Sequence, residues 1–335
     1  MLLKIVHRTT YDYAPAALRV VLRLRLFPSE CDGQSVKQWS VRVNGEGVDP
    51  IFTDGFGDRI CLWATNTECE HVEIIAEGVV DTADAAGVLT GLLRRPPPNL
   101  FLRETHLTAS NCAIAEFANR IRADTPLARM HALSHAVRQA IAYTPGATHA
   151  LTPATTAFEL GKGVCQDHSH VFIAAVRCLG IPARYVSGYI LTEDEISSPQ
   201  SGDGASIASE SMSSVTQTNH TDQMRPLRGS SESSSGGPGA NEMKFETSRP
   251  EIGPRPTSTH AWTEVHIPNL GWVGFDPTHA ICPTDRYVRL SAGLDADAVA
   301  PVLGAISGEA IASLTSDVIV CDATKEAPQI LQSQQ

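Results

Sequence analysis

The chain has 335 residues, of which 42% are hydrophobic and 19% charged, the composition of a globular protein with one large or two ordinary domains. Acidic residues outnumber basic ones by 37 to 26, and the net charge of −11 argues against a nucleic-acid partner, which needs a basic surface. No apolar run approaches the roughly 18 residues of a membrane helix, so we expect no membrane partner. The first eight residues are too short and too soon charged for a signal peptide, so we expect a cytoplasmic location.

The cysteines give no sign of a metal site. They stand at positions 31, 61, 69, 112, 165, 178, 282 and 321, and no two form a CxxC pair. The sequence therefore predicts no structural zinc site, and we expect neither a metal nor an organic cofactor. Reduced thiols are the expectation for a cytoplasmic protein.

Residues 1–90 are predicted to form a β-rich domain. Leucines alternate with arginines over 22–26, which is the pattern of a half-buried strand. Asn-Gly at 44–45 and Asp-Gly at 54–55 predict turns between such strands. A stiff, proline-rich connector over 91–100 then marks the domain boundary.

Residues 101–325 are predicted to form a second domain of mixed helices and strands. Thr125 followed by Pro126 is typical of a helix N-cap and first residue, and an apolar stripe follows. His131 and His135 lie on this helix at a spacing that can bind metal. Because no third ligand is apparent, we interpret both as surface residues.

A serine-rich insertion interrupts this domain at about 195–255. It has no aromatic residue between positions 197 and 235 and too little apolar surface to offset the entropy of ordering. We expect a disordered insertion between two strands. It serves either as an inert linker, the simpler interpretation, or as a phosphorylated regulatory loop. The last residues, 326–335, are expected to be frayed.

The most informative stretch is a helix that begins at Cys165. Apolar residues recur at helical spacing from Val171 to Leu179, and Gly180 with Pro182 ends the helix. A thiol in the first turn meets unpaired N–H groups and the positive end of the helix dipole, which both favour the thiolate. The simplest alternative is a small buried hydrophobic side chain.

A thiolate nucleophile needs a base, and the sequence offers one on a predicted hairpin. Residues 259–267 and 272–277 are predicted strands joined by a turn. If the loop spans Ile267 to Gly271, then His260 lies diagonal to Asp276 on one face, within reach of it. A shift of one residue would put Asp276 on the other face. Cys165, His260 and Asp276 thus have the composition of a nucleophile, a base and the group that orients the base.

The sequence around these residues closely resembles the bacterial transglutaminase-like family. The matching segments are His7–Tyr13, Gly163–Asp167, Gly180–Tyr189, His260–Val265 and Gly271–Thr278. The resemblance implies an α+β protein: an N-terminal β-sandwich-like domain, then a papain-like core whose cysteine-bearing helix packs on an antiparallel sheet. It also implies a catalytic triad of Cys165, His260 and Asp276 that acts on amide bonds of peptide or protein substrates, as a protease or as a transglutaminase.

Two positions depart from the family pattern. The family has an aromatic residue where His168 stands, and its tail carries an arginine and a tyrosine that the stretch 293–299 lacks. We expect packing rather than metal binding at His168, and a substrate subsite near the tail that differs from the usual one.

Five further residues are candidates for roles around the triad. The backbone N–H of Cys165 is expected to help hold an oxyanion, with Tyr143 or Gln166 as the second donor. Asp167 and His170 match family positions and are expected to support the site. Trp262 either lines the pocket or simply packs, and His279 is expected to be structural. Whether water or an amine resolves a thioester, the oligomeric state, and whether the fold acts instead as a non-catalytic peptide-binding module are left open by the sequence.

Overall fold

The structure is a computed structural model that describes residues 1–93, 96–192 and 259–325. The predicted serine-rich insertion and the predicted frayed tail lie outside the described residues. None of the helices in these ranges is long and apolar enough to cross a membrane.

Two antiparallel sheets make up the β-rich part of the chain. The first has the strand order β16-β1-β7-β3-β4 and the second β15-β2-β6-β5. Their strands are β1 (Leu2–Ala17), β2 (Arg19–Leu24), β3 (Gln34–Val43), β4 (Glu46–Gly47), β5 (Phe52–Thr53), β6 (Arg59–Thr65), β7 (Cys69–Thr82), β15 (Val302–Ser307) and β16 (Ile311–Asp322). Buried and exposed side chains alternate along β2, as its sequence predicts, and the buried set joins one hydrophobic core.

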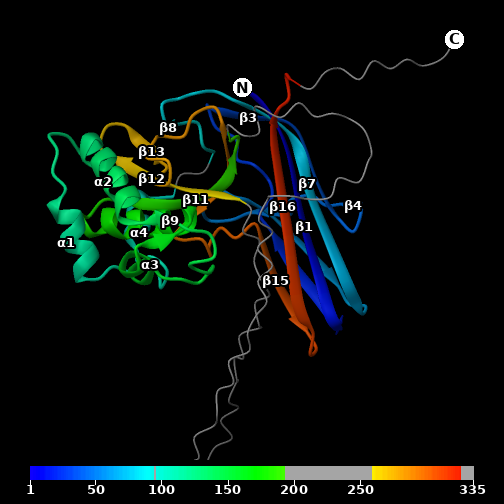
Figure 1. Cartoon of the computed structure of the whole chain (residues 1–335). Coiled ribbons are helices and arrows are strands. Elements are labelled where there is room, and N and C mark those ends of the chain that lie inside the picture. The colour runs from blue at the N-terminus through cyan, green and yellow to red at the C-terminus, as the bar shows by residue number, and fades with distance from the viewer. Residues whose placement is uncertain (94–95, 193–258, 326–335) are drawn as a thin grey trace, which may run out of the picture. The chain divides into compact units, whose positions relative to one another are not determined.

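The last two strands return to this β-rich part. β16 pairs with β1 along its whole length, from Ile311 opposite Ala14 to Asp322 opposite Leu3, and β15 pairs with β2. Figure 1 shows β16, β1 and β7 side by side in this order. Residues 302–322 therefore belong with the N-terminal strands, although the sequence analysis places everything up to residue 325 in the second domain. Because the paired residues of β1 and β16 are about 300 positions apart, no local sequence pattern indicates that these strands are neighbours.

The second part is built around one central helix, α4 (Cys165–Cys178), which is buried from Asp167 to Arg177. It contacts three other helices and three strands, so it is covered well beyond the single predicted apolar stripe. The other elements of this part are η1 (Pro98–Leu102), α1 (Cys112–Arg120), α2 (Pro126–Ala140), β9 (Ala142–Tyr143), α3 (Ala154–Leu160) and β10 (Lys162–Gly163). Thr125 caps α2 through its side chain, as predicted.

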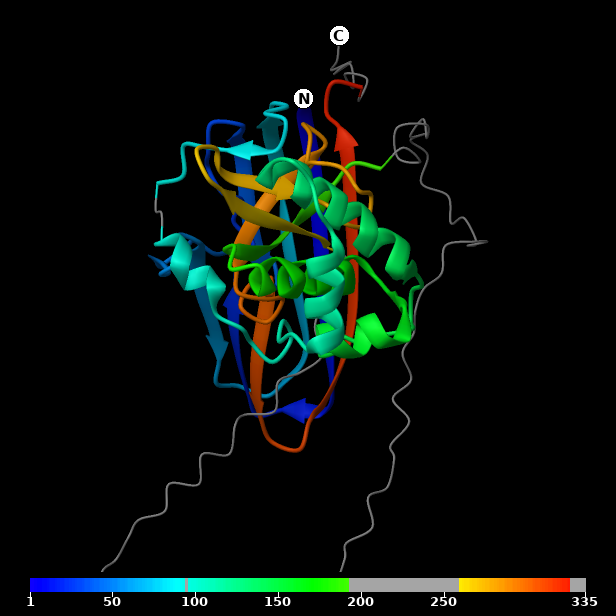
Figure 2. The ribbon, with the colours of Figure 1, turned by 90° about the vertical axis from the view of Figure 1, so that its left-hand side faces the viewer.

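The sheet against α4 has the strand order β14-β11-β12-β13-β8. Its strands are β8 (Val88–Leu89), β11 (Ala183–Ile190), β12 (His260–Ile267), β13 (Gly271–Phe275) and β14 (Tyr287–Gly293). Figure 2 views it from the side on which the helices lie. The first residues of β11 pack in the core around α4, whereas Tyr189 packs in the core of the β-rich part. Both faces of β11 are covered, and its residues are buried from Ala183 to Tyr189, the charged Arg184 included.

A buried ion cluster lies beside this sheet. Glu264 on β12 accepts hydrogen bonds from Arg184 at 2.6 Å and from Arg289 at 2.8 Å, and all three side chains are buried. The Arg184 guanidinium also lies 4.1 Å from the centre of the Trp272 ring. Gln34 on β3 donates to the backbone oxygen of Arg289, so the same cluster ties β14 to the first sheet.

Candidate active site

The start of α4 is fixed by the carboxylate of Asp167. This buried side chain accepts hydrogen bonds from the backbone N–H of Val164 at 2.8 Å and from the hydroxyl of Thr148 at 2.6 Å. A Cβ at Gly163 would lie 2.6 Å from Asp167, so only glycine lets the chain pass this close. Cys165 is consequently held as the first residue of the helix, where its own backbone N–H has no acceptor within the helix.

The hairpin of β12 and β13 has the predicted register. Ile267 lies opposite Gly271 and Thr263 opposite Phe275, so His260 and Asp276 share one face of the sheet. His260 Nε2 donates a hydrogen bond to Asp276 Oδ2 at 2.7 Å. That bond uses one ring nitrogen and leaves Nδ1 for the hydrogen bond between His260 and Cys165.

Asp276 is fully buried and collects hydrogen bonds on both carboxylate oxygens. Oδ2 accepts from His260, from His279 Nδ1 at 2.6 Å and from the Tyr287 hydroxyl at 2.8 Å. Oδ1 accepts from the backbone N–H groups of Thr278 at 2.8 Å and His279 at 3.3 Å. Burial alone would raise the pKa of Asp276, but these bonds and the two histidines hold it well below its usual range. The carboxylate is therefore ionised and fixed in orientation.

His260 lies between two groups of negative charge. Burial lowers its pKa, but the hydrogen bonds to Asp276 and Cys165 and the charges on both partners outweigh that effect and raise the pKa to about 10. The imidazolium is thus the favoured form of the ring at neutral pH when a thiolate stands beside it. This is the electrostatic arrangement of an activated cysteine.

Aromatic side chains surround the thiol and the imidazole. Trp262 stacks on His260 with ring centres 6.3 Å apart, and Gly188 leaves the room for it, since a Cβ there would lie 2.4 Å from the Trp262 ring. Tyr185 is buried and Tyr143 is 59% exposed. Burial and the charge of Cys165 raise the pKa of both tyrosines, so both hydroxyls are neutral donors near the sulfur.

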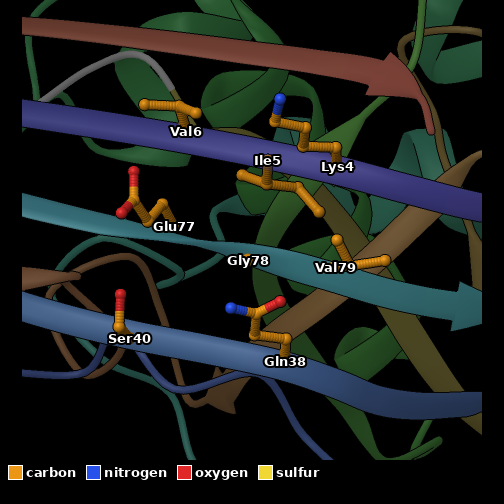
Figure 3. A pocket seen from close by; sticks show the side chains of 8 residues that line it. All are labelled: Lys4, Ile5, Val6, Gln38, Ser40, Glu77, Gly78 and Val79. Carbon is orange, nitrogen blue, oxygen red and sulfur yellow. The ribbon is translucent and has the colours of Figure 1, made fainter. Parts of the chain in front are cut away.

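A pocket on the β-rich part lacks such chemistry. Figure 3 shows it between β1, β7 and β3, where Gly78 has no side chain. Its volume is about 260 Å³, and it is lined by Lys4, Ile5, Val6, Gln38, Ser40, Glu77, Gly78 and Val79. No cysteine or histidine lies among these residues, so the cysteine, histidine and aspartate around α4 form the better candidate site.

Comparison with known proteins identifies the family of the chain. The sequence pattern of the Transglutaminase-like superfamily matches residues 115–277, and that of the Bacterial transglutaminase-like N-terminal region matches residues 3–81. The chain belongs to the bacterial transglutaminase-like family. Cys165, His260 and Asp276 all lie within the superfamily match.

Two mycobacterial relatives of this transglutaminase-like protein are described only as uncharacterized, and one solved structure has a similar fold. An uncharacterized protein of Mycobacterium leprae is 22% identical over 95% of this chain and 97% of its own length. An uncharacterized protein of Mycobacterium tuberculosis is 26% identical over 53% of this chain and 42% of its own length. A solved structure of a candidate cysteine protease from Cytophaga hutchinsonii superposes with a TM-score of 0.62 at 18% identity, covering 96% of this chain and 91% of that one.

The other predicted site residues of this transglutaminase-like chain lie around α4 in varied settings. Gln166 donates its side-chain amide to the backbone oxygen of Ala150 at 2.8 Å. His170 is buried, and its Nε2 accepts from the backbone N–H of Ala296 at 3.1 Å. Burial lowers the pKa of His170 to about 4, so this ring is neutral at pH 7. It ties α4 to the tail that departs from the family pattern.

His168 does more than pack. Its Nδ1 lies 2.8 Å from the backbone oxygen of Val164, and its Nε2 lies 3.0 Å from that of Ile141. A ring nitrogen must carry hydrogen to donate to a carbonyl oxygen, so both bonds form together only when the ring is doubly protonated. The side chain thereby joins the start of α4 to the segment that carries Tyr143, whose ring stacks on it.

Two residues at the site escaped the sequence analysis. Tyr287 was not singled out, and His279 was expected to be structural, yet both donate to the carboxylate of Asp276. For His279 the signal was its place three residues after Asp276, in a turn where the two side chains can meet. Tyr287 lies on the next strand, and its sequence position carries no such signal.

Among the described residues, one group of three side chains brings metal-ligating atoms together. It comprises His260, Asp276 and His279, whose ligand atoms all lie within 4.8 Å of one another. The histidines at 131 and 135 do not form such a group, and His131 instead packs edge-on against Phe275.

Proposed function

We propose that this chain is a thiol enzyme that acts on amide bonds of peptide or protein substrates through Cys165, His260 and Asp276. The observation that carries the proposal is the placement of His260, whose ring contacts the cysteine on one side and the buried aspartate on the other. A structural cysteine has no need of an oriented imidazole.

In this mechanism His260 and Cys165 form an imidazolium–thiolate pair, and Asp276 holds the ring in the required orientation. The thiolate attacks the carbonyl carbon of an amide and forms a tetrahedral adduct. His260 then gives its Nδ1 proton to the leaving amine, and the adduct collapses to a thioester on Cys165. Water or an incoming amine, deprotonated by the neutral His260, attacks the thioester and releases the product.

The oxyanion of the adduct needs donors. The backbone N–H of Cys165 is one, because it lies at the first position of α4 and points out of the helix. For the second we favour Tyr143 over Gln166. The Gln166 amide already donates to Ala150. Tyr143, by contrast, is exposed, and burial of its hydroxyl and the charge of Cys165 raise its pKa.

A substrate experiment tests the proposal. The full chain is incubated with a library of peptides that includes glutaminyl peptides, with and without a primary amine, and products are followed by mass spectrometry. Hydrolysis adds water to a fragment or deamidates glutamine, and transfer adds the amine. We expect Cys165→Ala to abolish either reaction.

The matched control is Cys112→Ala. Cys112 is the first residue of α1, as Cys165 is of α4, and it is exposed. It has the same helix position, and among the described residues no histidine forms a hydrogen bond with it. Loss of turnover in both variants, or in neither, would contradict the assigned role of Cys165. Peptide binding without turnover by the wild type would favour a non-catalytic binding module.

A further inference from the structure

One carboxylate oxygen in the site receives an unusual number of donors. Asp276 Oδ2 lies 2.7 Å from His260 Nε2, 2.6 Å from His279 Nδ1 and 2.8 Å from the Tyr287 hydroxyl. The proposed mechanism uses only the first of these contacts. A second imidazole on the same oxygen therefore remains to be explained.

Two imidazole nitrogens and a carboxylate oxygen are a common ligand set for Zn²⁺, which leaves a fourth position for water or another ligand. The spacing is also suitable. Ligand atoms in a tetrahedral zinc site lie about 3.3 Å apart, and His260, Asp276 and His279 already place theirs within 4.8 Å of one another. A separation of 2.6–2.7 Å at two of the pairs has to widen by only about 0.6 Å.

The three groups differ in burial, so that two of them are held inside the protein and the third is open to solvent. Asp276 is fully buried, the His260 side chain is 9% exposed and that of His279 is 45% exposed. Backbone N–H groups of Thr278 and His279 hold the other carboxylate oxygen in place. An ion can thus approach from the side of His279, the most exposed of the three ligands, and meet a carboxylate that is already oriented.

We propose that His260, Asp276 and His279 bind a divalent transition-metal ion, with Zn²⁺ as the probe, and that the bound ion reversibly switches off Cys165. The switch rests on the proposed function, whereas the binding site itself does not.

The switch follows from the two nitrogens of His260. A metal on Nε2 takes the electron pair of that nitrogen and displaces its proton to solvent, so Nδ1 must keep its own proton. A ring in this state cannot accept a proton from the thiol or from an attacking water. The carboxylate of Asp276 is at the same time drawn to the ion and away from orienting the ring.

Zinc binding is measured by calorimetry on the full-length Cys165→Ala variant, in which the catalytic thiol cannot contribute. The site predicts that adding His279→Asn weakens the binding at least 10-fold. The control adds His71→Asn instead, because His71 Nδ1 pairs with Asp12 at 2.7 Å on the surface and belongs to no three-ligand group among the described residues. Equal affinity in the His279 and His71 variants would overturn the proposal.

X-ray absorption on the zinc-loaded wild type identifies the ligands. A shell of nitrogen and oxygen atoms alone is expected, whereas a sulfur ligand would place the ion on a cysteine and overturn the proposal. Melting temperatures check that His279→Asn still folds.

The switch is tested by alkylation of Cys165 with iodoacetamide. One equivalent of zinc should slow labelling of Cys165 at least 10-fold in the wild type, EDTA should restore it, and His279→Asn should be insensitive. Labelling that zinc leaves unchanged would overturn the switch. If no peptide is ever turned over but the calorimetric difference persists, the proposed function fails and the metal site stands.

Discussion

Replacing Asp276 by asparagine tests how far the carboxylate sustains the reactive form of Cys165. The amide keeps the size of the side chain but removes its charge. It can still accept from the backbone N–H groups of the turn, and its NH₂ then faces the donors on His260, His279 and Tyr287. The imidazolium of His260 loses its buried counter-ion.

The size of the effect follows from the pKa of His260. A rise from 6.5 to about 10 corresponds to about 5 kcal/mol of extra stabilisation of the imidazolium over the neutral ring. Asp276 and Cys165 share this effect, and the hydrogen bond to Asp276 is the largest of the raising causes. We therefore expect Asp276→Asn to remove about 2–3 kcal/mol, which lowers the ratio of the thiolate–imidazolium pair to the neutral thiol–imidazole pair about 30- to 150-fold.

The assay is the rate of alkylation by iodoacetamide at pH 6.5, measured by mass spectrometry on the peptide that contains Cys165. The peptide that contains Cys112 is an internal control, since this thiol also begins a helix and is exposed. Its rate should not change. Tyr287→Phe removes one neutral donor and keeps the charge, so about 1 kcal/mol and a change of about fivefold are expected.

The reasoning is refuted if Asp276→Asn labels at the wild-type rate while its melting temperature shows that it is folded. It is also refuted if Cys112 slows as much as Cys165, because the effect would then belong to the reagent or to the helix position. If the alkylation rate of Cys165 falls more in Tyr287→Phe than in Asp276→Asn, the hydroxyl, and not the carboxylate, orients the ring.

Three other expectations concern stability and the start of α4. Glu264→Ala removes the carboxylate that is hydrogen-bonded to two buried arginines, so the free energy of unfolding should fall by about 3–5 kcal/mol in urea titrations, and a loss below about 1 kcal/mol would contradict this. Burial lowers the pKa of His7 to about 4, below its value of 6.5 in the unfolded chain. Stability that is present above pH 6.5 is therefore lost as the pH falls toward 4, by up to about 3 kcal/mol, and His7→Gln should remove this part of the fall; parallel curves for the two proteins would speak against it. Gly163→Ala forces Asp167 to move, so labelling of Cys165 should slow at least fivefold, and an unchanged rate would show that the helix start tolerates the methyl group.

Local signals predicted much of the fold and the place of the site. The alternation of leucines and arginines predicted a half-buried strand, and β2 has alternating buried and more exposed side chains. The register of the hairpin followed from its turn, and with it the meeting of His260 and Asp276. The N-cap of α2 was predictable because a hydroxyl-bearing residue directly before a proline is typical of a helix start, and the Thr125 side chain does accept a hydrogen bond from the first turn.

The features that could not be predicted from the sequence depend on contacts between segments far apart in the chain. The return of β15 and β16 to β2 and β1 is a long-range pairing that no window of sequence reveals. Tyr287 reaches Asp276 from another strand, and His168 is bonded to the backbone of Ile141, 27 residues away. A histidine alone in the sequence does not tell whether its partners are carbonyl oxygens, carboxylates or solvent.

The central claim is that His260 is an imidazolium held between Cys165 and Asp276, and nitrogen NMR of the ring tests it most directly. Because the pKa of His260 is raised to about 10, the claim requires both of its ring nitrogens to stay protonated at pH 8.5, well above the ordinary histidine pKa of about 6.5. In Cys165→Ala the titration should move to lower pH. A wild-type ring that is already neutral at pH 7.5 would contradict the account.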